Sequence, residues 1–217
     1  MNLMYCSHFA QKKTEVMIFN FKNDYQFSTR LYLNDTLLET VRETKLLGTI
    51  ISSDLKWHSN TDMIVKKAYK RIVILHKLYS FNVPDRDLVT IYILYLRSVL
   101  EQSCQVWHYS ITEEEKADLE RVQKVACRVI LKERYSSYET ALLTLNLQTL
   151  SERRDILCVR FAKKCLKMPQ TKDMFPLNPP DFPNVRQPEK FKVQFAHTGR
   201  LRDSALPQHS ESPQLGC

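Results

Sequence analysis

The chain has 217 residues and is 43% hydrophobic, enough to bury the core of one domain and to carry a tail. Its formal net charge of +8 arises mainly between residues 61 and 167, which hold 19 Lys and Arg against 13 Asp and Glu. Six cysteines without a CxxC pair indicate reduced thiols in an intracellular protein, which excludes a disulfide-framework protein. The chain shows no signal peptide and no apolar run long enough for a bilayer, so we expect a soluble protein without a membrane partner.

The first part of the chain, residues 1–57, has the composition of β-strands. Asn34 and Asp35 interrupt an alternating run and predict the turn of a hairpin. The expected strands are 15–21, 30–41 and 45–51. They predict a small antiparallel β-unit over residues 15–51.

Gly48 is unusual in this pattern. The chain has three glycines, and this one stands inside the expected strand 45–51. Glycine in a strand interior loses backbone entropy and packs nothing. We therefore expect a bulge or a close approach of another backbone at this position.

Residues 58–167 predict a helical bundle, which makes the fold class α+β. The expected helices are 61–81, 84–107, 112–131, 137–147 and 149–167. Pro84 suits a first helical turn, and 84–107 is apolar nearly all round, so it is expected to be the central buried helix. Capping boxes open two other helices, with Thr112 and Glu115 in one and Thr149 and Glu152 in the other.

Three of these helices show a stripe of apolar residues at helical spacing. The stripes are Ile64, Ala68, Ile72, Leu75 and Tyr79; then Leu119, Val122, Ala126, Val129 and Ile130; and, less regularly, Ile156, Val159 or Arg160, Ala162 and Leu166. Residues 168–217 contain eight of the nine prolines, so an irregular and partly disordered tail is expected there.

The sequence contains no recognisable set of catalytic residues. It contains no GxxxxGK[ST] or GxGxxG loop, and no two aspartates are adjacent. Cys104 and His108 have the spacing of two metal ligands on a helix, but no second pair accompanies them. A buried cysteine and a structural histidine are the better interpretation, so no catalytic residue, metal ligand or cofactor is predicted.

Two clusters of basic residues remain as candidates for binding a phosphate backbone. The first contains Lys66, Lys67, Lys70, Arg71 and Lys77; the second contains Arg153, Arg154, Arg160, Lys163, Lys164 and Lys167. Alternatively, these basic residues keep the helices soluble and form i,i+4 ion pairs with acidic residues. The sequence alone leaves both interpretations open.

Six segments of the chain, in order, resemble a known family. They are QKKTEVMIFNF, ETKLLGTIISSDLKW, IYILYLRSVLEQSCQVWHYS, LERVQKVACRVIL, YETALLTLNLQTLSERRDILCVRFAKKCLK and MFPLN. Together they closely resemble the C-terminal part of non-LTR (LINE-like) retrotransposon reverse transcriptases, from about residue 11 to about residue 205. The segment LEQSCQVW departs mildly from the family pattern, although Glu101 and Trp107 keep their places.

The resemblance implies roles for individual residues. Lys12, Lys13 and Thr14 match polymerase motif D at the edge of the palm, and the segment Lys45, Leu46, Leu47 and Gly48 matches motif E, the primer grip. The helices that follow resemble the thumb, which embraces the template–primer duplex. Gly48 would then lie close to the primer strand.

The resemblance also implies what the 217 residues lack. Motif A and the Tyr-x-Asp-Asp of motif C, which hold the catalytic aspartates, are not present, so we expect no polymerase activity from this chain alone. Mg²⁺ is expected only for a full-length polymerase. The implied function is a truncated reverse-transcriptase-like fragment with weak, electrostatic affinity for RNA or an RNA–DNA duplex. The alternative is a helical interaction or self-association module without a nucleic-acid role.

Overall fold

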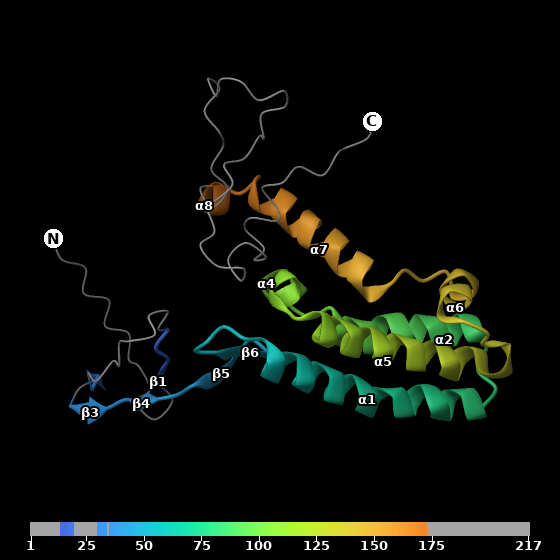
Figure 1. Cartoon of the computed structure of the whole chain (residues 1–217), viewed down its shortest axis with the longest axis horizontal. Helices are drawn as coiled ribbons and strands as arrows, with labels where there is room; N and C mark the ends of the chain where they lie inside the picture. The colour runs from blue at the N-terminus through green and yellow to red at the C-terminus, as the bar shows by residue number, and fades with distance from the viewer. Residues whose placement is uncertain (1–13, 20–29, 34, 173–217) are drawn as a thin grey trace, which may run out of the picture. The chain divides into compact units, whose positions relative to one another are not determined.

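The computed structural model describes residues 14–19, 30–33 and 35–172 and has an α+β fold, with short strands followed by helices (Figure 1). The chain divides into two compact units, Met1–Asn60 and Thr61–Cys217. Lys12 and Lys13 lie outside the described residues, as does the expected tail from residue 173 onward. The first residues of that expected tail form a short helix, α8 (Pro169–Lys172).

The described strands form three two-stranded ladders. In chain order they are β1 (Glu15–Val16), β2 (Tyr32–Leu33), β3 (Thr36–Leu37), β4 (Glu39–Thr40), β5 (Glu43–Leu46) and β6 (Thr49–Ser52). The β2–β3 ladder is the hairpin predicted from Asn34 and Asp35, and β5–β6 is a second antiparallel hairpin. The expectation of an entirely antiparallel unit is wrong for β1, which pairs with β4 in parallel. The connection between these two strands exceeds the dozen residues that a parallel crossover needs.

Gly48 lies in a turn, not inside a strand, which corrects the sequence-based expectation. The β5–β6 ladder closes at Leu46 and Thr49, so Leu47 and Gly48 form a two-residue hairpin loop. Both have positive φ, 49° at Leu47 and 88° at Gly48, as a type I′ turn requires. Glycine adopts this conformation without a steric penalty, whereas Leu47 adopts it at a cost. The two-residue loop therefore explains why a chain with few glycines has one here.

Hydrogen bonds within residues 1–60 fix this second hairpin. Asn60 Oδ1 accepts a hydrogen bond from the Ile50 backbone N–H at 3.1 Å. Ser52 Oγ donates to the Lys56 carbonyl at 2.6 Å, and the chain then leads to Trp57, which is buried. These bonds determine the course of the chain from β6 to the first helix.

Helices make up the rest of the described chain. They are α1 (His58–Ser80), α2 (Asp85–Ile91), the π-helix η2 (Tyr92–Arg97), α3 (Ser98–Leu100), α4 (Cys104–Trp107), the 3₁₀-helix η3 (His108–Ser110), α5 (Glu113–Leu131), the 3₁₀-helix η4 (Lys132–Arg134), α6 (Tyr138–Leu145) and α7 (Leu150–Cys165). Within the described ranges, no helix has both the length and the apolar character that crossing a membrane requires.

The expected single helix over 84–107 is broken after Leu100. The break occurs because Ser103 adopts a left-handed conformation, φ 52° and ψ 26°, which an α-helix cannot continue through. Trp107 Nε1 donates to the Gln102 carbonyl at 3.0 Å and stabilises the turn. This segment is also not buried on all sides, since Leu94 is 70% exposed.

The core of the helical unit follows two of the three predicted stripes. All five residues of the α5 stripe are buried, and so are four of the five on α1, where Tyr79 stays partly exposed. Both capping boxes are confirmed. The prediction for α7 is wrong in part, because only Ala162 of the predicted stripe is among the buried residues. The residues that α7 buries are Leu150, Arg154, Cys158, Ala162 and Cys165. The buried face of α7 thus includes a charged residue, which an apolar pattern cannot predict.

Replacing Gly48 tests the turn. Gly48→Val places a β-branched residue at φ 88° and should destabilise the hairpin by about 1–2 kcal/mol. The backbone amides of β5 and β6 should then exchange hydrogen about tenfold faster, measured by NMR. Gly48→Asn is the matched control, because asparagine tolerates positive φ and should change exchange less. Equal exchange rates in both variants would contradict the turn assignment.

Candidate nucleic-acid interface

In the first unit, the described candidate residues gather at the tip of the β5–β6 hairpin. Lys45 pairs with Ile50 in the ladder, one residue pair before the closing pair, and its side chain is exposed. Leu47 is 90% exposed at the loop itself. The tip therefore presents an apolar side chain and a cation to solvent.

In the helical unit, α1 carries a line of lysines on its exposed face. Lys66, Lys70 and Lys77 are spaced by four and seven residues, which places them on one side of the helix, opposite the buried stripe. Lys66 pairs with Asp62 at 2.5 Å, an exposed contact that water and salt screen. The described residues provide no ion pair to Lys70 or Lys77. This set of three residues is called the α1 lysine stripe below.

The neighbouring Arg71 is engaged inside the fold. Its guanidinium lies 4.2 Å from the centre of the Tyr95 ring, and Nη1 donates to the Tyr95 carbonyl, which belongs to η2. These contacts fix Arg71 as a link between α1 and η2 rather than as a free cation. Lys67 is exposed on the flank of the stripe.

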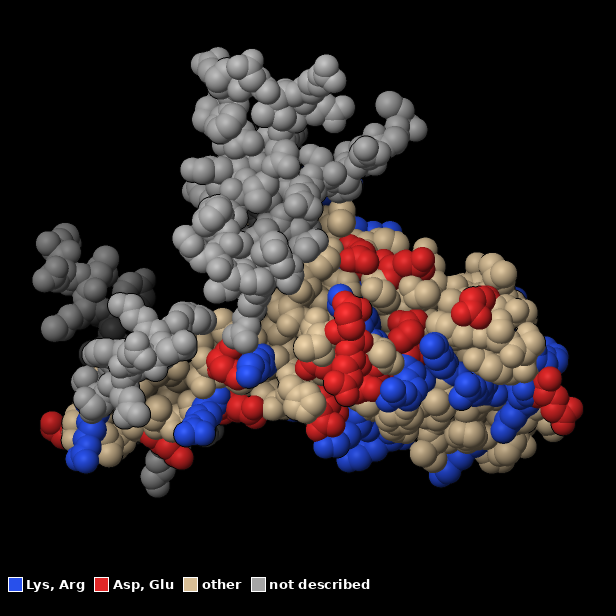
Figure 2. Space-filling view, in the orientation of Figure 1, with Lys and Arg blue, Asp and Glu red and all other residues tan. Residues whose placement is uncertain are grey.

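Figure 2 shows the charges of one face of the molecule. Basic side chains lie along α1 and α5, and acidic ones are mixed among them. The first turn of α5 contributes Glu113, Glu114 and Glu115, which favour the positive end of its helix dipole. On the face shown in Figure 2, the basic residues are therefore distributed among acidic ones.

The second predicted cluster is separated by the fold. Arg154 is fully buried, so its assignment as a surface contact for phosphates is wrong. Arg153 Nε donates to Glu101 Oε1 at 3.1 Å and is only partly exposed. Lys163 and Lys164 are exposed in the last turn of α7, where cations also stabilise the negative end of the helix dipole. Helix stabilisation alone therefore accounts for these two lysines.

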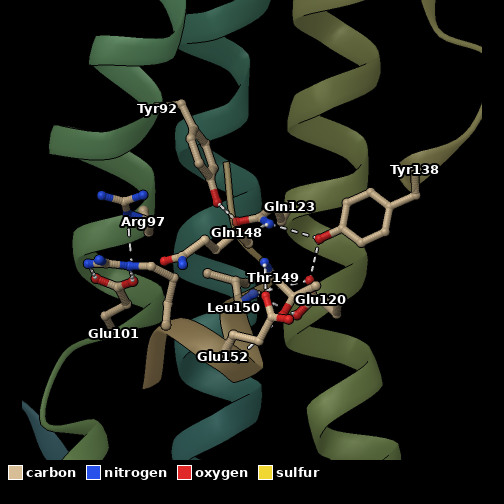
Figure 3. Close-up of polar contacts among 11 residues, drawn as sticks. Tyr92, Arg97, Glu101, Glu120, Gln123, Tyr138, Gln148, Thr149, Leu150 and Glu152 are labelled. Atoms are coloured by element: carbon tan, nitrogen blue, oxygen red, sulfur yellow. Dashed lines mark hydrogen bonds and ion pairs between the residues drawn. The ribbon is translucent and has the colours of Figure 1, made fainter. Parts of the chain in front are cut away.

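Glu101 joins two arginines at the break between α3 and α4 (Figure 3). Arg97 Nε lies 3.6 Å from Glu101 Oε1, and Arg153 binds the same carboxylate from α7. All three side chains are less than about one quarter exposed, so solvent screens their interaction only in part. The basic residues Arg97 and Arg153 are thus used to hold the chain at its turn.

Arg154 lies among residues of α4 and η3. Its Nε donates to His108 Nδ1 at 3.1 Å, and its guanidinium lies 5.8 Å from the Trp107 ring centre. His108 Nε2 in turn lies 3.0 Å from Asp155 Oδ1. Since Nδ1 accepts from Arg154, the proton of a neutral His108 must be on Nε2, which donates to Asp155. Burial and the nearby Arg154 cation together lower the pKa of His108 to about 4, and Asp155 opposes them only in part.

A second polar group ties η2, α5, α6 and α7 together (Figure 3). Gln123 is fully buried; Tyr92 Oη donates to its carbonyl oxygen, and its Nε2 donates to Tyr138 Oη at 2.8 Å and to the Gln148 carbonyl at 2.9 Å. Tyr138 Oη donates to Glu120, which also accepts the Leu150 backbone N–H at 3.1 Å. Every polar atom of the Gln123 amide has a partner, so this group stabilises the fold.

The sequence analysis missed both buried polar groups. Gln123 and Arg154 occupy positions at helical spacing with apolar neighbours, and that spacing is the one signal that could have identified them. Cys104 and His108 are both buried, as expected if they are a core cysteine and a structural histidine. Among the described residues, no cluster of three or more His, Cys, Asp and Glu side chains could hold a metal ion.

Comparisons of this chain with protein-family models, with curated proteins and with solved structures find no match.

The His108 site predicts a pH-dependent stability. Because the folded-state pKa is about 4 and the ordinary value is 6.5, the unfolded chain binds a proton more readily between these values. The free energy of unfolding should therefore fall as the pH drops through 6.5 and level off near 4, by up to about 3 kcal/mol from this residue. Urea unfolding at several pH values measures this. His108→Gln should show a shallower decline; an equal decline would contradict the assignment.

Proposed function

We propose that this chain is the palm-edge and thumb part of a reverse-transcriptase-like polypeptide of the non-LTR retrotransposon type, and that it binds RNA–DNA duplexes weakly through electrostatic contacts. The six ordered segments support the relationship. The observation that carries the binding proposal is the α1 lysine stripe, whose side chains are exposed and largely without acidic partners in the described chain.

The stripe has a suitable length for a phosphate backbone. Lys66 and Lys77 are eleven residues apart on one helix, which corresponds to about 16 Å along the axis. Flexible lysine side chains at that separation reach several phosphates of a duplex, and each neutralised phosphate releases counterions. Such contacts hold a duplex without reading its sequence.

We further propose that these 217 residues do not polymerise nucleotides by themselves. Two-metal phosphoryl transfer needs clustered carboxylates, and the chain contains no Tyr-x-Asp-Asp. Primer extension with Mg²⁺ should give no product above background, and extension that survives purification would contradict this part of the proposal.

The binding proposal is tested by a charge-removing double variant. Lys70→Gln with Lys77→Gln should lower the affinity for a labelled RNA–DNA hybrid about tenfold at low salt, measured by fluorescence anisotropy. The slope of log K against log salt should also become smaller by about 1 to 2, because two phosphate contacts are lost.

The matched control removes two charges from α5 instead. Lys116 and Arg121 already pair with Glu113 at 2.7 Å and with Asp118 at 2.5 Å, so Lys116→Gln with Arg121→Gln should change binding little. An equal loss in both double variants would mean that only net charge matters. Binding that ignores salt, or no binding at low salt, would refute the interface.

The second candidate function is a helical self-association module. It is favoured by large apolar side chains at the surface of the helical unit, with Leu94 70% exposed, Leu143 84% exposed and Phe81 76% exposed. Scattered apolar residues are normal on a monomer, whereas a contiguous patch drives association. Light scattering on the samples used for the binding measurements distinguishes the two, since a clean monomer argues against this candidate.

A further inference from the structure

Two buried cysteines meet where α4 packs on α7. The Cys158 thiol donates a hydrogen bond to the Cys104 backbone carbonyl, with Sγ 3.8 Å from the oxygen. His108 follows Cys104 by four residues and Arg154 precedes Cys158 by four residues, and Arg154 Nε donates to His108 Nδ1 at 3.1 Å. The two contacts are four residues apart on each segment and run in opposite directions along the chain. This antiparallel pairing places Cys104 opposite Cys158 at the α4–α7 contact.

The break in the 84–107 segment creates this pairing. The left-handed Ser103 redirects the chain immediately before Cys104, and Glu101 is held to α7 by Arg153. Cys104 is thereby fixed from both sides, by the ion pair before it and by the contact of His108 with Arg154 after it. Neither cysteine forms a disulfide in this structure.

The two thiols have different acidities. The neighbouring Cys158 side chain lowers the pKa of Cys104 despite burial, and the nearby Arg154 cation lowers it as well. The neighbouring Cys104 side chain and burial both raise the pKa of Cys158. Cys104 is therefore the thiol that ionises more readily, and a thiolate is the nucleophilic form of cysteine.

We propose that Cys104 and Cys158 form a redox modification site that a hydroperoxide converts to a disulfide. The Cys104 thiolate attacks one oxygen of hydrogen peroxide, the O–O bond breaks, and the leaving hydroxide takes up the proton that Cys104 released on ionising and becomes water. The Cys158 sulfur then attacks the resulting sulfenic acid, the S–O bond breaks, and the second water leaves with the Cys158 proton. Two electrons pass from the thiols to the peroxide. This inference does not depend on the proposed nucleic-acid binding.

The other described cysteines lack this arrangement. Burial raises the pKa of Cys127 to about 12, and it lies on α5 rather than at the α4–α7 contact. Cys165 is buried beside Ala162 and Leu166. The site is therefore selective for one pair among the four described thiols.

The full-length chain is treated under native conditions with millimolar hydrogen peroxide, then alkylated, digested without reduction and analysed by mass spectrometry. The expected product is a linked pair of peptides that contain Cys104 and Cys158. The bond closes a loop across 54 residues, so the melting temperature should rise by roughly 5–10 °C and return after reduction.

Single variants separate the two chemical steps. In Cys158→Ser, the sulfenic acid on Cys104 has no resolving thiol and should be trapped by dimedone. The matched control Cys127→Ser also removes one buried thiol, and it should still form the Cys104–Cys158 bond. A linked peptide that joins other cysteines instead would overturn the proposal. So would a pair that stays reduced in the folded chain.

Discussion

The helical unit depends on the buried amide of Gln123. An amide without partners in an apolar interior costs several kcal/mol, so its carbonyl and its N–H₂ group must each be satisfied for the fold to be stable. Tyr92, Tyr138 and the Gln148 carbonyl satisfy them, and these three come from η2, α6 and the segment before α7. One side chain on α5 thus determines where three other parts of the unit lie. The adjacent carboxylate of Glu120 extends the same constraint to the first turn of α7.

A second consequence of the packing is that basic residues have three different roles. Arg154 is inside the fold, where burial lowers its pKa and His108 accepts a hydrogen bond from it. Arg97 and Arg153 hold Glu101 at the turn before α4. The lysines of the α1 stripe are left at the surface. A net charge computed from the sequence counts all of these equally, although among these three groups only the stripe is exposed to solvent.

The α4–α7 contact combines these roles in one place. It contains an ion pair, a buried histidine that stays neutral near pH 7, and two cysteines that lie opposite each other. Oxidation of the thiols would add a covalent link to a contact already determined by polar groups. The α1 lysine stripe belongs to another helix, so the proposed binding of a duplex and the proposed oxidation at α4–α7 can be tested separately.

Local chemistry was sufficient to predict the two capping boxes, the β2–β3 turn and the apolar stripe of α5, because each depends on residues a few positions apart. It also indicated that Gly48 has a special backbone conformation, but it placed that conformation in a strand instead of a turn. The parallel pairing of β1 with β4, the break at Ser103 and the burial of Arg154 depend on segments far apart in the chain. The sequence by itself determined which segments become helices or hairpins. Only the tertiary structure decided which charges are buried, because the groups that contact a buried charge, such as His108 at Arg154, come from other elements.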